Sequence, residues 1–375
     1  MRRILYVVNV SWFFVSHRLP IALQAKRCGF DVHVAATPSG NVDTIVEAGL
    51  EFHPLEIRRS GGNPLRDVYS LMQMLRLYRR LRPDIVHHVT SKPVLYGSIA
   101  ARMAAIPSIV NAVPGLGLVF SARGRMTGLR RGLVLFAYRI ALPRKRCKVI
   151  FQNVENRDLF VRRGLVRQED TVLIKGSGVD LRQFSCSPEC GDIPVVVLAS
   201  RMLREKGVPE FVEAARLLNK KGVRAKFALF GGIDTENPSH IPADQLDEWN
   251  AEGDVHWYGH DSDMAKVFSA AHIACLPTFY GEGVPKALIE AAASGRPIVT
   301  TDVPGCRDIV RHEWNGLLVP SRDVTALADA IMRLINDPEL RTTMGQRGRS
   351  LVENEFALNR VVADTLKVYE ELQPV

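Results

Sequence analysis

Short apolar runs alternate with segments of helical spacing along the first half of the chain. Runs of strand length occur at residues 4–10, 32–36, 85–88 and 108–113. Helical patterns separate them, and the longest covers residues 67–81. This order of strand, helix and strand is typical of a parallel sheet whose strands are joined by crossover helices.

The alternation restarts after a polar, turn-rich segment at residues 185–192, which is typical of a linker. Beyond it the pattern predicts strands at residues 195–199, 226–230, 273–276 and 297–300 and a helix at 209–219. We therefore predict an α/β protein with two doubly wound domains in tandem. The N-terminal domain is expected at 1–184, with a helix at about 356–375 packing back on it, and the C-terminal domain at 185–355.

Composition narrows the class of protein. The chain has 375 residues, of which 46% are hydrophobic and 24% are charged, an ordinary globular composition that excludes disorder and collagen. The six cysteines form no C-x-x-C pair, which favours reduced thiols in a cytosolic protein. Residues 1–8 are interpreted as a first strand rather than a signal peptide. No apolar stretch reaches about 18 residues, so any membrane contact is expected to be peripheral.

The formal net charge of +9 is distributed unevenly. Residues 1–185 carry 29 basic and 12 acidic side chains, a balance of +17, whereas residues 186–375 carry 20 and 28, a balance of −8. A basic half indicates an anionic partner, which is a nucleic acid, a membrane surface or a phosphorylated substrate.

The first candidate chemistry lies in the loop at residues 200–207, which leaves a buried strand and opens a helix. It carries Arg201, Arg204 and Lys206. In doubly wound sheets ligands bind beyond the carboxyl ends of strands, and cations placed there converge on phosphate. The alternative is a solvated charged turn.

A second loop, at residues 277–290, follows the strand at 273–276 and opens a short helix. The amides of Gly283 and Val284 lie at the start of that helix, where an anion is favoured. Glu290 lies about five residues into the helix, where its carboxylate would accept hydrogen bonds from a ribose diol. The alternative is an ordinary surface glutamate. Gly231 and Gly232, after the strand at 226–230, either let backbone approach a nucleotide or form a simple turn.

Together these loops resemble the retaining family-4 glycosyltransferases of the GT-B fold, in their bacterial polysaccharide and lipid-linked-oligosaccharide branch. The resemblance covers nearly the whole chain. Further motifs similar to that branch are Ser16-His17-Arg18-Leu19-Pro20, residues 90–97, Gly115-Leu116-Gly117, residues 176–180, residues 258–264 and residues 303–307. It implies two Rossmann-like domains that face an interdomain cleft.

The resemblance also implies roles for the donor loops. A UDP-sugar donor would bind the C-terminal domain, with Arg201 and Lys206 neutralising the diphosphate leaving group and Glu290 holding the ribose. Glu282, with the amides of Gly283 and Val284, would contact the donor sugar and phosphate. Arg201, Lys206 and Glu282 are thus the candidate catalytic residues, and Glu290, Gly283, Val284, Gly231, Gly232 and Arg204 the candidate donor-binding residues. The resemblance implies that anomeric configuration is retained by front-face attack, in which the leaving phosphate accepts the acceptor's proton. This chemistry requires no metal, so we expect no metal and no cofactor.

On the acceptor side the chain departs from the family pattern. Pro114 stands where many members have a histidine, and His87-His88-Val89 replaces an H-x-H motif, so a catalytic histidine is not carried over. His17 is instead the candidate for a polar contact near the reacting groups, at the start of a helix in the first strand-end loop; its alternative is a capping or packing histidine. The other acceptor-side candidates are Lys92, Gly115 and Gly117.

A D-x-D sequence at residues 261–263 has the form of a metal motif. Because it precedes a helical pattern, we predict that Asp263 caps that helix.

No Asp or Glu occurs between residues 85 and 154, and eleven basic residues do. Leu129, Leu133, Phe136 and Ile140 recur there at helical spacing. Apolar residues beside dense cations are typical of a surface that docks on an anionic bilayer. The alternative is a core helix with a basic back. The residues assigned to a membrane or lipid diphosphate are Arg123, Arg125, Arg130, Arg131, Arg144, Lys145, Arg146 and Lys148.

The leading hypothesis is a retaining glycosyltransferase, peripheral at the cytoplasmic membrane face. It would move an N-acetylhexosamine or hexose from a UDP-sugar to a polyprenyl-diphosphate-linked saccharide in surface polysaccharide or glycan assembly. One alternative is a sugar-nucleotide epimerase or hydrolase of the same fold. A second is a basic nucleic-acid-binding protein, but the basic stretch lacks interleaved aromatics and no nucleic-acid-binding motif occurs, so no nucleic acid is expected as a partner.

Overall fold

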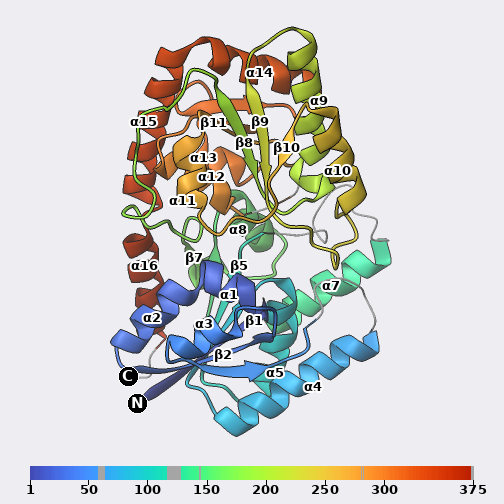
Figure 1. The fold of residues 1–375 in the computed structure, drawn as a ribbon. Coiled ribbons are helices and arrows are strands. Elements are labelled where there is room, and N and C mark those ends of the chain that lie inside the picture. Colours follow the sequence, from blue (N-terminus) through green and yellow to red (C-terminus); the bar gives the residue numbers. More distant parts are fainter. Residues whose placement is uncertain (58–63, 116–127, 143–144, 280, 282, 373–375) are drawn as a thin grey trace. The chain divides into compact units, whose positions relative to one another are not determined.

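The structure is a computed structural model that describes residues 1–57, 64–115, 128–142, 145–279, 281 and 283–372. The chain divides into two compact units (Figure 1). Unit 1 comprises Met1–Ser177 and Asn359–Val375, and unit 2 comprises Gly178–Leu358. The sequence placed the boundary at residue 184. Residues 178–184 lie in unit 2 because Val179 and Phe184 are buried in its core.

Unit 1 contains a seven-stranded sheet with the order β3-β2-β1-β4-β5-β6-β7. All its strand pairs are parallel. The strands are β1 (Arg2–Val10), β2 (Phe30–Thr37), β3 (Glu51–Pro54), β4 (Ile85–Val89), β5 (Ser108–Val113), β6 (Cys147–Phe151) and β7 (Thr171–Leu173).

Helices cover both faces of this sheet, because alternate residues of each strand point to opposite sides. In β1, Tyr6 and Val8 pack on one side and Leu5 and Val7 on the other. The first side is covered by α1 (Ser11–His17), α2 (Leu19–Arg27), α3 (Val42–Glu47) and α16 (Leu358–Glu371). The second side is covered by α4 (Pro64–Leu81), the π-helix η1 (Pro93–Gly97), α5 (Ser98–Met103), α7 (Gly128–Ala141) and α8 (Val154–Arg162), and the 3-10 turn η2 (Gln168–Asp170) precedes β7.

Unit 2 contains a six-stranded parallel sheet with the order β10-β9-β8-β11-β12-β13. Its strands are β8 (Val195–Ala199), β9 (Lys226–Phe230), β10 (His256–Trp257), β11 (Ile273–Leu276), β12 (Ile298–Thr301) and β13 (Gly316–Val319). Its helices are η3 (Arg204–Lys206, a 3-10 turn), α9 (Val208–Lys220), α10 (Ala243–Glu252), α11 (Met264–Ala270), α12 (Lys286–Ala293), α13 (Cys306–Ile309), α14 (Val324–Asn336) and α15 (Pro338–Glu355).

The predicted fold class, two doubly wound α/β domains, is confirmed. In each sheet the strand order reverses once, between β1 and β4 in unit 1 and between β8 and β11 in unit 2. Ligands of such sheets bind beyond the carboxyl ends of the strands at this reversal. The loops that follow β8 and β11 are the two donor loops singled out from the sequence, so the topology places them where a ligand site is expected.

The last helix, α16, is anchored to unit 1 by its tyrosine. The Tyr369 hydroxyl lies 2.6 Å from His87 Nδ1 and donates to the Tyr6 hydroxyl at 3.0 Å. All three side chains are buried. These contacts tie the end of the chain to β1 and β4.

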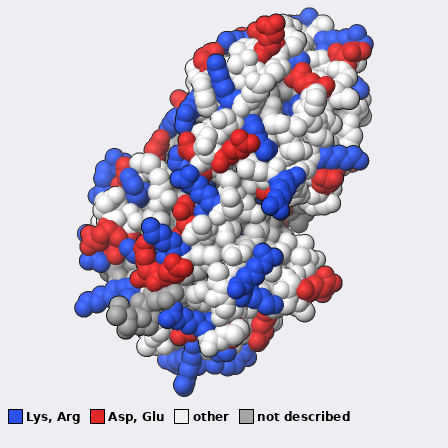
Figure 2. All heavy atoms as spheres, turned by 90° about the vertical axis from the view of Figure 1, so that its left-hand side faces the viewer, with Lys and Arg blue, Asp and Glu red and all other residues white. Residues whose placement is uncertain are grey.

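No helix among the described residues is long and apolar enough to cross a membrane. Figure 2 shows one face of the molecule, on which basic and acidic side chains are interspersed in both units. The basic excess of the first half is therefore not gathered into a single patch on this face.

Candidate functional site

The loops after β8 and β11 pack directly against each other. The carbonyl oxygen of Glu205 accepts hydrogen bonds from the Phe279 amide at 3.1 Å and from Thr278 Oγ1 at 3.0 Å. Gly207 permits this approach, because its φ is +77° and a Cβ there would lie 2.2 Å from the carbonyl oxygen of Pro277. The two predicted donor loops therefore form one continuous surface.

Arg201 is anchored within this surface by a buried carboxylate. Its Nη1 donates to Asp234 Oδ2 at 2.6 Å. Asp234 is 8% exposed, whereas the Arg201 side chain keeps 40% of its surface in solvent. Arg204 lies further out and donates from Nη2 to Gln245 Oε1 at 3.0 Å. The cation nearest the strand end is thus held in place, as an anion site requires.

Glu290 is buried at the fifth position of α12. It is 7% exposed, and its Oε1 lies 3.2 Å from Lys286 Nζ. Burial raises the pKa of this carboxyl group, and the Lys286 ammonium partly opposes the rise. The residue is therefore not an ordinary surface glutamate. Burying this carboxylate costs free energy, and it lies one turn from the start of the helix, where it can accept hydrogen bonds.

The amides proposed to bind the donor phosphate lie just before α12. Gly283 and Val284 are both buried, and Pro285 occupies the N-cap position. The dipole of a helix favours an anion near its first turn. The prediction for Glu282 falls on a residue outside the described part of the chain.

The glycine pair after β9 has a structural role, the alternative that the sequence left open. Gly231 has a φ of +144°, and a Cβ there would lie 1.7 Å from the carbonyl oxygen of Ser200. The Gly232 carbonyl accepts from the Met202 amide at 3.1 Å. These glycines bring the end of β9 against the loop that carries Arg201. A contact of either glycine with a nucleotide stays a prediction.

The prediction for Asp263 is confirmed, because its Oδ1 accepts from the Lys266 amide at 3.1 Å and caps α11.

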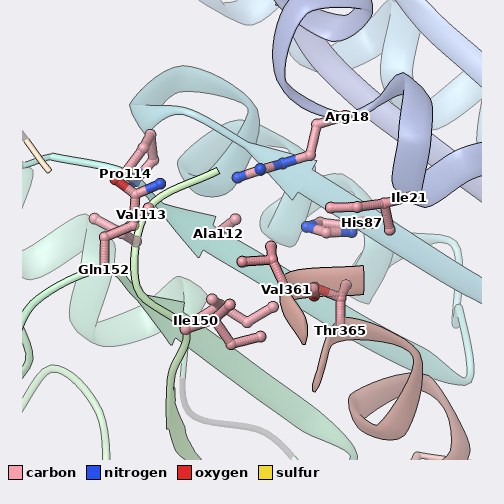
Figure 3. A pocket seen from close by; sticks show the side chains of 12 residues that line it. Arg18, Ile21, His87, Ala112, Val113, Pro114, Ile150, Gln152, Val361 and Thr365 are labelled. Carbon is pink, nitrogen blue, oxygen red and sulfur yellow. The ribbon is translucent and has the colours of Figure 1, made fainter. Parts of the chain in front are cut away.

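In unit 1, a small cavity lies at the carboxyl ends of β5 and β6, and Arg18 and His87 point into it (Figure 3). Its volume is about 10 Å³, enough for roughly one water molecule. Arg18 is 5% exposed, and its Nη1 donates a hydrogen bond to the carbonyl oxygen of His17 at 3.1 Å. Among the described residues, its Nε has no hydrogen-bond partner and no carboxylate forms an ion pair with it. Burying a guanidinium without a counterion costs free energy, and a bound anion would offset that cost.

The two histidines of β4 have different surroundings. His88 is enclosed, with Nδ1 2.9 Å from Asn111 Oδ1 and Nε2 2.9 Å from the Tyr78 hydroxyl, and burial lowers its pKa to about 4. His87 uses Nδ1 on Tyr369 and turns Nε2 toward the cavity. Burial and the nearby Arg18 charge lower the pKa of His87 well below its usual range. Of the two, only His87 lines the cavity.

The prediction that His17 starts a helix is wrong. Residues 11–17, expected as a loop, form α1, and His17 is its last residue. Its imidazole stacks on Phe13 with ring centroids 4.1 Å apart and an angle of 6° between the planes. This contact agrees with the alternative interpretation of His17 as a packing residue. The cavity is lined by the next residue, Arg18.

The remaining acceptor-side candidates are dispersed. Lys92 forms an ion pair with Asp67 Oδ1 at 2.8 Å, and the Tyr96 hydroxyl donates to the other oxygen of Asp67 at 3.0 Å. Gly115 is partly exposed, two residues after β5, and Gly117 lies outside the described residues.

The structure describes only part of the predicted membrane-binding set. Lys145 and Arg146 are exposed in the turn before β6, and Lys148 donates from Nζ to the carbonyl oxygen of Glu169 at 2.9 Å. Three of the others, Arg123, Arg125 and Arg144, lie outside the described residues. Arg130 and Arg131 belong to α7, but their side chains are not described.

Two residues at these sites were missed by the sequence analysis. Arg18 was noted only within the motif that contains His17, and Asp234 was not noted at all. A basic residue directly after an apolar strand-and-helix pattern was the available signal for Arg18. Nothing in the local sequence distinguishes Asp234 from other loop aspartates, because its pairing with Arg201 spans 33 residues.

Comparison with known proteins agrees with this geometry. Residues 3–153 match the family described as glycosyl transferase 4-like, and residues 186–351 match glycosyl transferases group 1. One match therefore falls on each parallel sheet. The crystal structure of Anabaena Alr3699/HepE in complex with UDP and glucose shares the fold, with a TM-score of 0.79 at 17% identity over 99% of this chain and 100% of that one.

Two curated relatives span nearly the whole chain. One is the N,N'-diacetylbacillosaminyl-diphospho-undecaprenol alpha-1,3-N-acetylgalactosaminyltransferase of Campylobacter jejuni, 27% identical over 368 residues and covering 95% of each chain. The other is the UDP-Gal:alpha-D-GlcNAc-diphosphoundecaprenol alpha-1,3-galactosyltransferase of Escherichia coli, 23% identical over 92% of this chain and 89% of the relative.

Fold and sequence thus define the class of protein, a glycosyltransferase with the GT-B fold. The chain belongs to the group 1 and 4-like glycosyltransferase families, and its predicted resemblance to the bacterial lipid-linked polysaccharide branch is confirmed by these relatives.

Proposed function

We propose that this protein is a retaining, metal-independent glycosyltransferase of bacterial surface glycan assembly. It transfers an N-acetylhexosamine or hexose from a UDP-sugar to a polyprenyl-diphosphate-linked saccharide at the cytoplasmic face of the membrane. The names of the two curated relatives support both the diphosphoundecaprenol acceptor and, for one of them, a UDP-sugar donor.

The observation that carries the proposal is the joined surface of unit 2. Arg201, anchored by Asp234, and the buried Glu290 lie on two loops that are hydrogen-bonded to each other at the reversal of strand order. A cation suits a diphosphate, and a buried carboxylate suits the paired hydroxyls of a ribose.

This arrangement suits the chemistry of glycosyl transfer. Cleavage of the bond between the sugar and the diphosphate leaves positive charge on the sugar ring and adds negative charge to the leaving phosphate. Arg201, Lys206 and the amides of Gly283 and Val284 would stabilise that negative charge. Because Asp234 holds Arg201 in place before the reaction, little reorganisation of this cation is needed. In a front-face mechanism the leaving phosphate accepts the proton of the acceptor hydroxyl, which keeps the anomeric configuration.

On the acceptor side we assign a role to Arg18. It lies with His87 at the carboxyl edge of unit 1, where ligands of such a sheet bind. The cavity itself holds no more than about one water molecule, so an anion would contact the guanidinium at its mouth. The lipid-linked acceptor carries such an anion in its diphosphate.

Two helices on the same face of the unit 1 sheet support contact with a bilayer. On α7, Tyr138 and Ala141 are buried, whereas Phe136 and Ile140 are 60% and 47% exposed beside the exposed Arg139. The helix therefore has a face turned to solvent that is both apolar and basic, not only a basic back.

The second helix, α4, was not assigned this role from the sequence. Its first two turns expose an apolar stripe at helical spacing, and its last turns expose arginines. The stripe is Leu65, Val68, Tyr69 and Met72, and the arginines are Arg76, Arg79 and Arg80. An apolar stripe next to cations is typical of helices that lie in the membrane interface.

Donor binding and turnover test the site directly. UDP and UDP-sugars are expected to raise the melting temperature of the protein, since they bind only the folded state. Glu290→Ala and Arg201→Ala are expected to lose this shift and to lower kcat/KM at least a hundredfold, because each removes a charge-assisted contact. Glu339→Ala and Arg311→Ala, at exposed positions of unit 2, serve as matched controls.

Two further readouts define the reaction. Transfer should persist in EDTA, and NMR of the product should show the anomeric configuration of the donor. UDP release without an acceptor at the same rate would indicate a hydrolase, and wild-type turnover in both site variants would refute the assignment of the site.

A further inference from the structure

At the outer edge of the unit 1 sheet, two histidines and two carboxylates gather on one face of adjacent strands. His33 of β2 pairs in register with Glu51 of β3. Asp31 and His53 lie two residues away on their respective strands, so all four side chains point to the same side of the sheet. They lie toward the amino ends of these strands, whereas the candidate donor and acceptor sites follow carboxyl ends.

Three ligand atoms of this cluster lie within 4.8 Å of one another. His33 Nδ1 is 2.9 Å from His53 Nε2, and the two carboxylate oxygens of Glu51 each lie 3.5 Å from one of these nitrogens. Both imidazoles are buried, at 2% and 7% exposure, whereas the Glu51 side chain is 62% exposed. The cluster is therefore closed on the protein side and open to an ion from solvent.

We propose that His33, His53 and Glu51 form a zinc site that joins β2 to the edge strand β3, with water as the fourth ligand. Metal–nitrogen bonds of about 2.05 Å in a tetrahedron place two ligand nitrogens about 3.4 Å apart. The imidazoles would need to separate by roughly half an ångström from their present 2.9 Å. The ion takes the place of the proton that now lies between the two nitrogens, and that proton moves through solvent to the other ring nitrogen of His53, so that both ligands stay neutral imidazoles.

Asp31 contacts one of the proposed ligands, His33, without being a ligand itself. Its Oδ2 lies 3.1 Å from His33 Nε2 and accepts a hydrogen bond from Arg3 Nε at 2.8 Å. The angle at this distance makes no hydrogen bond in the structure, but the negative charge of Asp31 favours a proton on Nε2, which directs the lone pair of Nδ1 toward the metal.

Calorimetry with Zn²⁺ and the visible absorption of the Co²⁺ form test the site on untagged full-length protein. We expect one equivalent to bind with micromolar or tighter affinity, Co²⁺ to give the strong visible bands of tetrahedral coordination, and Zn²⁺ to raise the melting temperature. Glu51→Gln and His53→Gln are expected to weaken binding at least tenfold. Asp31→Asn is expected to weaken it about 10- to 100-fold without removing a ligand.

The controls separate this site from adventitious binding. Glu47→Gln and His256→Ala change an exposed glutamate and an exposed histidine elsewhere, and both should bind Zn²⁺ like the wild type. The Glu51→Gln variant changes an exposed side chain and is expected to stay folded even if His53→Gln does not. Circular dichroism checks the fold of both variants. Absence of binding by the wild type, or equal affinity in Glu51→Gln, would overturn the proposal. Neither outcome bears on glycosyl transfer, which does not use this site.

Discussion

At the scale of single residues, the candidate sites are marked by buried polar groups that destabilise the fold. Arg18 has no counterion among the described residues, Glu290 is a buried carboxylate with a raised pKa, and Asp234 is a buried partner for a cation that reaches solvent. Burying such groups costs free energy unless a partner offsets it. These groups lie near the carboxyl ends of strands, where ligands bind. We therefore interpret the cost of burying them as the cost of forming a binding site.

Arg18→Met tests this reasoning for the acceptor side. Replacing a buried, unpaired cation by an apolar chain of similar length is expected to leave the melting temperature unchanged or raised. The KM for the lipid-linked acceptor should rise at least tenfold, because an anion contact is lost, while UDP binding stays unchanged. Steady-state kinetics with thermal unfolding would check both. Lower stability with unchanged kinetics would show that Arg18 is structural.

His88 predicts a pH dependence of stability. Its pKa of about 4 in the folded state lies below the usual value of 6.5, so the unfolded state binds more protons between these limits. The free energy of unfolding should therefore fall as pH drops from about 6.5 to about 4, by up to about 3 kcal/mol from this group. Urea unfolding of the wild type and of His88→Gln should show a shallower pH dependence for the variant. Parallel curves would contradict the prediction.

At the scale of elements, the candidate donor site consists of two loops that pack into one surface. The 3-10 turn η3 and the left-handed Gly207 place the Glu205 carbonyl against Thr278 and Phe279. The short α12 then begins directly after the second loop. Because the two loops are hydrogen-bonded to each other, a change in one is expected to disturb ligand contacts made by the other.

Gly207→Ala and Gly222→Ala form a matched pair for this claim. Both glycines have a left-handed φ, +77° and +73°, but only a Cβ at residue 207 meets backbone, the Pro277 carbonyl, while nothing lies within 4 Å of one at 222. Both variants should lose about 1 kcal/mol of stability through backbone strain. Gly207→Ala should lose more and should also weaken UDP binding. Chemical denaturation and calorimetry measure both effects, and equal behaviour of the pair would contradict the account.

The exposed stripe of α4 predicts membrane affinity. Leu65 and Val68 are 81% and 59% exposed, and a bilayer would bury both. Replacing both by serine should weaken liposome flotation at least tenfold, since full burial of each such side chain is worth about 1.5–3 kcal/mol. Val46→Ser, an equally exposed change on α3 across the sheet, is the control. UDP binding should be unaffected in every variant, and unchanged flotation of the double variant would refute this role.

At the scale of the whole molecule, the sequence was sufficient for the architecture because buried parallel strands are long apolar runs with helices between them. The places of the two candidate donor loops, directly after β8 and β11, were also predictable, since the loops lie next to strands in the chain. Five strands were not predicted, namely β3, β6, β7, β10 and β13. Four of them lie at the edges of the two sheets, and β7 and β10, with three and two residues, are too short to show a periodicity. Residues joined across the fold, such as Asp234 with Arg201 or His33 with His53, carry no local signal at all.

The unequal charge of the two halves also fits this architecture. The more acidic second half places its few strand-end cations on one surface, whereas the basic first half carries α4, α7 and the buried Arg18. We interpret this difference as the separation of a soluble donor from a membrane-bound anionic acceptor.

The central claim is tested most directly by glycosyl transfer in a bilayer. The full-length protein would be incubated with a panel of UDP-sugars and a polyprenyl-diphosphate-linked saccharide in anionic liposomes, and the lipid fraction analysed by mass spectrometry. The account predicts that the lipid-linked saccharide gains one hexose or N-acetylhexosamine from one UDP-sugar, and that Arg201→Ala abolishes this gain. No gain with any UDP-sugar, or an equal gain with Arg201→Ala, would contradict it.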